Sequence, residues 1–376
     1  MAVTNTVGLR SWAEEAASAA ARHAEEAETN RVLSPEVAKA LVTAGFARHF
    51  VPGRWGGADG GVIELLEATS LVGTHCTSAA WCGSLAAGAA RMGVFLPEQG
   101  QAELWANGPD AMVAGALIPS AMAEPVADGW LLTGEWDFTS GVDYSDWALV
   151  AARVPTDDGV RPWFFAVPRA DYSVKDTWSP VGMRGTGSNT LMLDGVLVPR
   201  HRAFDREEML LGRAVGSSAP CHAVALRTVS GILFAAPALG AARGALREWS
   251  ARMSGRTGKT GTPMREDRST QLTAARVSAE IDMAEMLLRR VARTCDRGGT
   301  TKIDAVRNPH DCAVAVDGLV GAVERLFRSA GSRGQLAASP LQRFWRDVHF
   351  LSSHVALQLE PAAAGYGAHL LEHPVT

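Results

Sequence analysis

The residue types that would indicate a disulfide framework, a metal centre or a membrane anchor are scarce in this chain of 376 residues. It has only five cysteines, which are scattered and odd in number, and no two of them form a Cys-x-x-Cys pair. This usage argues against disulfides and zinc and favours a reducing compartment. No stretch approaches the roughly 18 uninterrupted apolar residues of a membrane span, and the first residues lack the features of a signal peptide. We therefore expect a cytoplasmic protein with no membrane span and no metal.

A large excess of charge of either sign is also missing. The formal net charge is -4 and the isoelectric point is about 6.2. Nucleic-acid binding needs a basic face, so these values give no reason to expect a nucleic-acid partner. Hydrophobic residues make up 47% of the chain and charged residues 20%, which is ordinary for a soluble globular protein. The expected partners are small molecules and proteins, and the length favours two or three domains.

The first third of the chain has the pattern of helices. Alanine and glutamate fill residues 11–28, Ser34 followed by Pro35 is typical of a helix start, and Gly45 ends that second helix. Further helices are expected over residues 62–73, 77–92 and 97–107. Residues 1–111 are therefore predicted to form an N-terminal helical domain.

The pattern changes at about residue 112, where short apolar or alternating runs are separated by Gly, Asp and Pro. These runs, which we expect to be strands, cover residues 112–118, 130–133, 147–152, 163–167 and 190–193. A central β domain over residues 112–215 is the prediction.

Helices return after the β domain, and a C-terminal four-helix bundle is expected over residues 216–376. One helix carries an apolar stripe at alternating spacings of four and three residues, which is typical of a bundle helix. The stripe consists of Val277, Ile281, Ala284, Leu288 and Val291. Two more long helices are expected over residues 309–330 and 339–360. The last would place Asp347 and His354, two turns apart, on one face, with Asp347 as a structural residue paired with an arginine.

Four separated segments resemble the acyl-CoA dehydrogenase superfamily in the same order along the chain. They are residues 51–57 (Val-Pro-Gly-Arg-Trp-Gly-Gly), residues 129–141, residues 182–199 (beginning Gly-Met-Arg-Gly-Thr-Gly-Ser) and the Arg346-Asp347 helix. The resemblance implies an α+β fold of helical domain, β domain and four-helix bundle. In the dehydrogenases a Glu-Gly-Thr run supplies the base at the depth where this chain has His354 and Val355. An imidazole near neutral pKa can exchange protons with phenols or peroxides, so we expect changed chemistry on the same scaffold.

One segment favours a particular branch of that superfamily. Residues 136–141 (Trp-Asp-Phe-Thr-Ser-Gly) resemble the Trp-x-Phe-Ser-Ser-Gly segment of two-component flavin-dependent monooxygenases such as the 4-hydroxyphenylacetate 3-hydroxylases. The resemblance implies an oxygenase component that takes FMNH2 or FADH2 from a separate NAD(P)H:flavin reductase and reacts with O2. A flavin C4a-hydroperoxide would then hydroxylate an aromatic or polycyclic small molecule, in secondary metabolism or aromatic catabolism. No Gly-x-Gly-x-x-Gly run opens a helix after a strand, so no nicotinamide domain is expected.

The same resemblance implies roles for individual residues. Trp136 and Phe138 would wall the flavin ring and exclude water, although two aromatic residues at this spacing are by default strand residues facing one core. A hydroxyl of Ser140, or secondarily of Thr139, would hydrogen-bond near the flavin N5. Ser140 and His354 are the catalytic candidates, with His354 as the acid or base.

Other residues are expected at the edges of the site. The substrate pocket is expected to be lined by Trp81, Cys82 and Phe95. By resemblance, Arg256 reaches the flavin phosphates of a neighbouring subunit with help from Gln271, and Arg265 is an alternative to Arg256. This arrangement implies a homotetramer in which the four-helix domains pack together.

Three other functions compete with this prediction. The nearest is amine oxidation, as in amino-sugar N-oxygenases of the same branch. An acyl-CoA dehydrogenase or oxidase is disfavoured because Glu360, the only nearby carboxylate, comes six residues after His354. A non-catalytic protein that retains the fold is the third.

Overall fold

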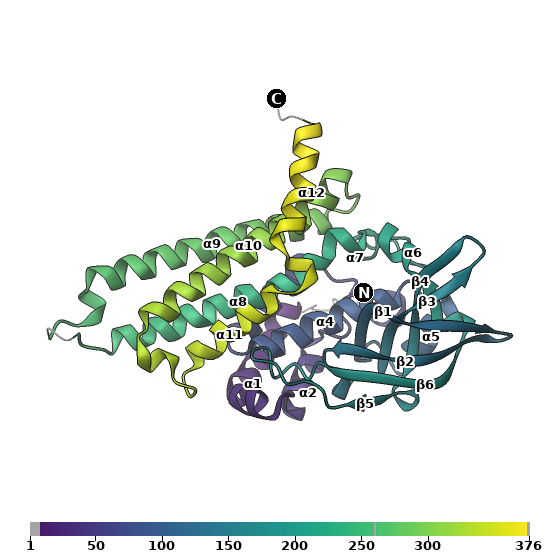
Figure 1. The fold of residues 1–376 in the computed structure, drawn as a ribbon, viewed down its shortest axis with the longest axis horizontal. Coiled ribbons are helices and arrows are strands. Elements are labelled where there is room, and N and C mark those ends of the chain that lie inside the picture. The colour runs from purple at the N-terminus through teal and green to yellow at the C-terminus, as the bar shows by residue number, and fades with distance from the viewer. Residues whose placement is uncertain (1–7, 259–260, 374–376) are drawn as a thin grey trace, which may run out of the picture.

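The computed structural model describes residues 8–258 and 261–373, and Figure 1 shows helices at the N-terminus, a sheet, and a long helical bundle. Residues 1–6, on which the expectation of no signal peptide rests, lie outside the described part. The N-terminal helices are α1 (Leu9–Asn30), α2 (Pro35–Ala44), α3 (Val62–Gly73), α4 (Thr77–Gly93) and α5 (Glu98–Leu104). All five predicted helices are present, with bounds within a few residues of those expected.

The start and end of α2 follow from its sequence. The Ser34 hydroxyl accepts a hydrogen bond from the backbone N–H of Val37 at 3.3 Å, and Pro35 occupies the first turn. Gly45 ends the helix with φ +96°, a left-handed conformation that glycine adopts without steric cost. These are the features that predicted the helix.

A seven-stranded sheet occupies the middle of the chain. Its strands are β1 (Val113–Val126), β2 (Gly129–Thr139), β3 (Trp147–Thr156), β4 (Gly159–Pro168), β5 (Ser173–Lys175), β6 (Asn189–Pro199) and β7 (Ala203–Asp205). The order across the sheet is β5-β6-β2-β1-β3-β4-β7. The β1–β3 pair is parallel and the other pairs are antiparallel. All five predicted strands are present and are longer than expected, and the short strands β5 and β7 were not predicted.

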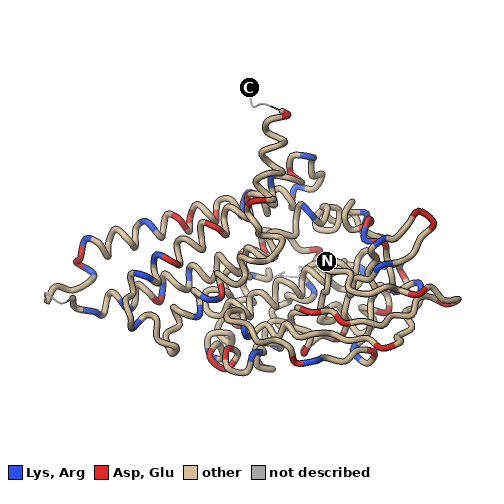
Figure 2. Tube along the Cα trace, in the orientation of Figure 1, with Lys and Arg blue, Asp and Glu red and all other residues tan. Residues whose placement is uncertain are grey.

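The remaining helices form the C-terminal part of the chain. They are α6 (Arg206–Leu211), α7 (Pro220–Ala223), α8 (Leu226–Ser254), α9 (Arg268–Asp296), α10 (Lys302–Ser329), α11 (Pro340–Ser352) and α12 (Leu359–Glu372). Helices α8 to α11 are the four long helices of a bundle, and the predicted stripe of α9 is buried. Figure 2 shows both signs of charge interspersed along the outer helices of this bundle.

The last predicted helix is wrong in one respect that affects the site. Helix α11 ends at Ser352, and α12 begins only at Leu359 and projects away from the body of the molecule (Figure 1). His354 lies between them with φ -62° and ψ 137°, which is an extended and not a helical conformation. Asp347 and His354 therefore do not share a helix face.

Helix α8 is the one helix in the described residues that is long and apolar enough to cross a membrane. Of its most apolar window, 83% is buried inside the protein. The helix packs against α3, α4, α9, α10 and α11. Its composition is explained by this central position in the core.

Candidate functional site

The three parts of the chain meet at Trp81 on helix α4. The indole N–H of Trp81 donates a hydrogen bond to the hydroxyl oxygen of Ser140, 3.1 Å away, directly after strand β2. The ring of His354, from the turn after α11, meets the Trp81 ring edge to face with centroids 5.7 Å apart. The two residues predicted to be catalytic, Ser140 and His354, are therefore brought to the same indole from distant parts of the chain.

A second aromatic ring holds His354 in place. Phe234 on α8 stacks against the imidazole with centroids 3.8 Å apart and ring planes inclined by 26°. Phe234 also contacts the Trp81 ring at 5.2 Å. The imidazole thus has an aromatic partner on two sides, and its orientation is fixed by packing.

The hydrogen bonding of His354 determines which ring nitrogen carries the proton. The backbone N–H of Ala356 donates to Nδ1 of His354 at 3.2 Å. Burial lowers the pKa of His354 to about 4, so the ring is neutral at physiological pH. A neutral imidazole that accepts at Nδ1 carries its proton at Nε2. The predicted near-neutral pKa is therefore wrong, and His354 presents an N–H donor.

A chain of hydroxyl groups begins at Ser140. The Ser140 and Ser188 hydroxyl oxygens are 2.8 Å apart, those of Ser188 and Thr186 are 2.7 Å apart, and Thr186 donates to the carbonyl of Met183 at 2.9 Å. An indole N–H only donates, a carbonyl only accepts, and each hydroxyl has one proton. The protons therefore all point from Trp81 toward Met183, and the Ser140 oxygen keeps one lone pair that none of these bonds uses.

The structure does not place Trp136 on a site wall. Its side chain is 1% exposed in the core of the β domain, and its indole N–H donates to the carbonyl of Ala151 at 2.7 Å. The Thr139 hydroxyl is also buried and donates to the carbonyl of Trp136 at 2.9 Å. Both side chains are committed to the fold, so neither is available to a ligand in this conformation.

Phe138 lies on the opposite side from Trp136, contrary to the expectation for alternate residues of a strand. The pairing of β2 with β6 shifts register between Trp136 and Thr139, and Phe138 has a φ of +59°. Its ring is 68% exposed and meets the Trp178 ring edge to face at 6.0 Å. The bulge turns Phe138 outward, two residues before Ser140, where its ring is open to a flat ligand.

The three predicted substrate residues lie in three different environments. Trp81 belongs to the site with Ser140 and His354. The thiol of Cys82 faces a separate buried cavity and donates to the carbonyl of Thr186 at 3.7 Å. Phe95 is wrong as a pocket residue, because it is 2% exposed and packs against Phe204 in a core between α4 and the sheet.

The predicted phosphate residues lie at the far end of the bundle. Arg256 follows the end of α8, and an α-helix rises about 1.5 Å per residue, so Arg256 is roughly 30 Å from Phe234 along the helix. Figure 1 shows the α8–α9 connection at the tip of the molecule opposite the sheet. Gln271 is exposed in the first turn of α9 and donates to the carbonyl of Arg265. These residues do not meet Ser140 within one chain.

Asp347 has a structural partner different from the expected arginine. It is buried beneath the loop that carries the hydroxyl chain, and its carboxylate accepts the backbone N–H of Met183 at 2.6 Å. The neighbouring Arg346 pairs instead with Glu28 at 2.7 Å. Burial raises the pKa of Asp347 to about 6.

Two contributors to the site were not predicted. Ser188 lies in the segment of residues 182–199 that resembles the superfamily, and the hydroxyl residues there are a signal that could have suggested a chain of hydrogen-bonded hydroxyls. Phe234 lies in an apolar stretch of α8, and nothing in the neighbouring sequence distinguishes it from an ordinary core residue. Its role depends on how α8 packs against α4 and α11.

A comparison with known proteins decides the family. The chain is 32% identical over 371 residues to the oxygenase component of an FADH2-dependent resorcinol hydroxylase from Rhizobium sp. strain MTP-10005, covering 93% of this chain and 90% of the relative. The chain belongs to the flavin-dependent monooxygenases. Residues 232–359 also match the family of acyl-CoA dehydrogenase C-terminal domains.

Two solved structures share the whole fold. The 3-HSA hydroxylase from Rhodococcus sp. RHA1 superposes with a TM-score of 0.91 at 27% identity, covering 99% of both chains. XiaF from Streptomyces sp., in complex with FADH2 and glycerol, gives a TM-score of 0.91 at 25% identity, covering 98% of this chain and 96% of its own. The acyl-CoA dehydrogenase-like fold and the monooxygenase class predicted from the sequence are confirmed.

The site of this monooxygenase also lacks the base of an acyl-CoA dehydrogenase. Glu360, the nearest carboxylate in sequence, is exposed on α12 and lies beyond the turn that holds His354. Among the described residues, no cluster of three or more His, Cys, Asp or Glu side chains can hold a metal ion. The chemistry of the residues present is that of neutral hydrogen-bond donors and acceptors around aromatic rings.

Proposed function

We propose that this chain is the oxygenase component of a two-component system. It takes reduced flavin from a separate NAD(P)H:flavin reductase in the cytoplasm and uses dioxygen to hydroxylate a small aromatic substrate. The observation that carries the proposal is the meeting of Ser140, Trp81 and a neutral His354 at one point between the three parts of the chain. The hydroxylase relative described above is an FADH2-dependent oxygenase component, which agrees with it.

The unused lone pair of Ser140 fits a reduced flavin better than an oxidised one. A reduced isoalloxazine carries a hydrogen at N5, whereas the oxidised ring has only a lone pair there. Because the Ser140 proton is committed to Ser188, its oxygen can accept from the reduced ring but cannot donate to the oxidised one. The exposed ring of Phe138 next to it offers an apolar face to the same flat ligand.

When bound, a reduced flavin supplies the electrons that activate dioxygen, and the residues of this chain orient the substrate. Trp81 and Phe234 are 8% and 7% exposed and hold the imidazole of His354 between them, so that its orientation toward the substrate is fixed. The Nε2–H of His354 is a neutral donor that would hydrogen-bond an oxygen atom of the bound substrate. The proton stays at Nε2 at rest because the Nδ1 lone pair is occupied by the Ala356 N–H.

The first prediction is that the purified chain binds reduced flavin more tightly than oxidised flavin. Anaerobic titration with FMNH2, FADH2 and their oxidised forms measures the preference for reduced over oxidised flavin. The same titration measures the preference between FMN and FAD. Replacing Ser140 by alanine removes the acceptor, so the preference for the reduced form should fall about tenfold, as loss of one hydrogen bond implies. Tight oxidised-flavin binding with reduction by an acyl-CoA thioester would instead support a dehydrogenase.

The outer face of helix α9 supports the proposal of a homotetramer. Leu272, Met283 and Met286 are all more than half exposed. At about 100° per residue these three positions fall within roughly 60° of one another around the helix. Soluble proteins rarely leave a continuous apolar helix face uncovered. We propose that the bundles of neighbouring subunits pack on this face, which would bring Arg256 and Gln271 to a partner's flavin phosphates.

The second prediction concerns this α9 face. Replacing Met286 by lysine puts a charge into the proposed interface, and a buried unpaired charge costs several kcal/mol. The tetramer should therefore dissociate into smaller species in size-exclusion chromatography with light scattering. Met122→Lys, at an exposed position of strand β1, is the matched control and should leave the mass unchanged. An unaltered mass for the Met286 variant would place the interface elsewhere.

A further inference from the structure

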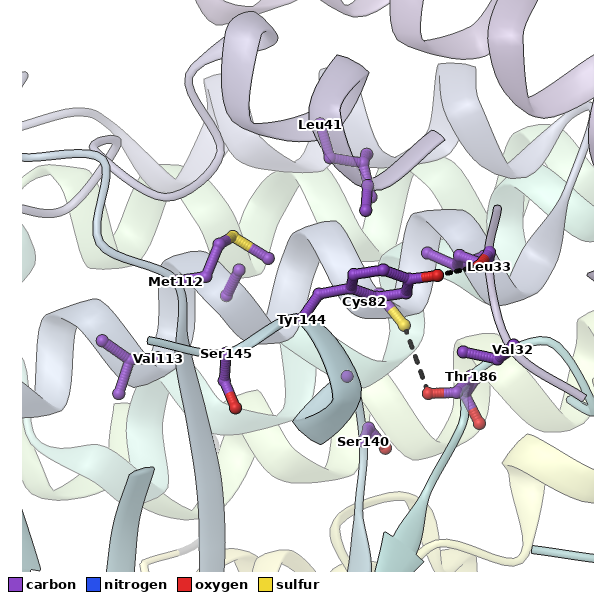
Figure 3. Close-up of a pocket in the computed structure, with 13 residues that line it drawn as sticks. Val32, Leu33, Leu41, Cys82, Met112, Val113, Ser140, Tyr144, Ser145 and Thr186 are labelled. Atoms are coloured by element: carbon purple, nitrogen blue, oxygen red, sulfur yellow. Dashed lines mark hydrogen bonds between the residues drawn. The ribbon is translucent and has the colours of Figure 1, made fainter. Parts of the chain in front are cut away.

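A small cavity lined in part by Ser140 lies on the side of α4 that faces α2 and the sheet. Thirteen residues line it, and Figure 3 shows Leu41, Cys82, Met112 and Tyr144 converging on it above Ser140. Most of the lining is apolar. Ser140 thus lines this cavity and also accepts the hydrogen bond from Trp81, the ring that packs against His354.

The side-chain donors around the cavity are already used. The Tyr144 hydroxyl donates to the carbonyl of Leu33 at 2.5 Å, the Ser145 hydroxyl to that of Val142 at 2.8 Å, and the Cys82 thiol to that of Thr186 at 3.7 Å. The Ser140 and Thr186 protons belong to the hydroxyl chain. A buried water normally makes about three hydrogen bonds, and a water here would find no free side-chain donor and only oxygen lone pairs, such as that of Ser140, as acceptors. The cavity is suited to an apolar occupant.

The size of the cavity excludes the aromatic substrate. Its volume is about 20 Å³. An apolar cavity that binds benzene is about 150 Å³, whereas one water needs roughly 10–15 Å³ measured this way. The cavity therefore has room for one small molecule of two or three atoms and no room for an aromatic ring.

We propose that this cavity is a binding site for dioxygen, from which the gas reaches the flavin past Ser140. This inference rests on the proposed function, because a flavoprotein that does not react with dioxygen has no need of the gas there. Dioxygen is apolar and makes no strong hydrogen bonds, so a mostly apolar cavity without a free side-chain donor suits it better than it suits water. None of the cavity-lining residues is Trp81, Phe234 or His354, so a substrate bound beside His354 would not occupy the gas site.

The cysteine at the cavity wall is compatible with dioxygen. Burial raises the pKa of the Cys82 thiol well above its usual range, so almost no thiolate forms at neutral pH. The thiolate is the form of cysteine that reacts with oxidants. Cys82 therefore acts as a small apolar wall residue next to the gas.

Krypton is the probe for the site, since it is apolar, close to dioxygen in size and visible by anomalous scattering. Crystals of the full chain pressurised with krypton should show one atom between Leu41, Tyr144 and Ser140. Replacing Ala86, which lines the cavity from α4, by valine should abolish that krypton peak. Ala90→Val, one turn further along α4 and buried in a different cluster, should leave it unchanged.

The kinetic counterpart uses the same variants. Dioxygen consumption by the chain loaded with reduced flavin should slow severalfold in Ala86→Val and stay unchanged in Ala90→Val. Ala38→Val fills the cavity from α2 and replaces Ala86→Val if that variant does not fold. No krypton in the wild-type cavity, or an unchanged rate in a variant that has lost krypton, overturns the proposal. A wild-type chain that binds krypton but hydroxylates no aromatic compound counts against the proposed function and not against the gas site.

Discussion

Replacing His354 by alanine is expected to lower the rate of hydroxylation about 100-fold or more while changing reduced-flavin binding little, because a positioned donor of this kind contributes to the reacting state. The physical reason is the Nε2–H that the structure assigns to the neutral ring. Single-turnover product analysis measures the rate, and anaerobic titration measures flavin binding. Unchanged product formation would remove His354 from the mechanism.

Two further variants separate a hydrogen-bond donor from a proton carrier. A glutamine at position 354 places its amide N–H near the position of Nε2, whereas an asparagine places it near Nδ1, which in the wild type only accepts. If donation is sufficient, His354→Gln should recover much of the rate and His354→Asn should not. If proton exchange is required, neither amide should recover it, because amides do not titrate in this range.

The pH dependence follows from the same ring. With a pKa of about 4 in the folded state, His354 stays neutral above pH 5, so the hydroxylation rate should show no inflection near pH 6.5 from this residue. In the unfolded chain the pKa of His354 is near its ordinary value of 6.5. Between pH 4 and pH 6.5 the unfolded state therefore binds more protons at His354 than the folded state does. Stability is therefore lost as pH falls through this window, and His354→Ala should reduce that loss.

Much of the fold could be predicted from the sequence because its local signals agree with its tertiary packing. The Ser34 cap, the closing Gly45 and the buried stripe of α9 are where their patterns indicated. Ser140 and His354, both singled out from the sequence, contact the same indole, that of Trp81, and their catalytic role stays a prediction. These features depend on short-range rules or on runs of residues that are recognisable by themselves.

The errors arose where the backbone departs from a regular element. The outward turn of Phe138 depends on a bulge with a positive φ at a residue other than glycine, which no local signal indicates. Helix α11 ends at Ser352, where no proline or glycine marks the end of the helix, so the sequence pattern continues as if the helix did. The position of Phe234 depends on packing between helices that are distant in sequence. Each case needed the tertiary structure.

Removing the carboxylate of Asp347 should destabilise the folded chain by about 2 kcal/mol, because it leaves the buried N–H of Met183 without an acceptor. Met183 has a φ of +57°, which is unfavourable for a side chain of this kind, and Asp347 is the contact from α11 that holds it there. At the neighbouring Gly182, an added Cβ would lie 2.4 Å from the carbonyl oxygen of Arg346. Thermal or urea unfolding of Asp347→Ala measures the loss.

The isosteric Asp347→Asn variant separates the hydrogen bond from the charge. Because the folded pKa is raised to about 6, the carboxyl favours folding at low pH and loses this contribution as pH rises through 6. The asparagine keeps an acceptor and does not titrate, so the stability of this variant relative to the wild type should improve between pH 4 and pH 7.

Met183 also anchors the hydroxyl chain through its carbonyl. Asp347→Ala should therefore weaken the preference for reduced flavin, whereas Asp347→Asn should retain it, and equal effects of both variants would contradict this coupling.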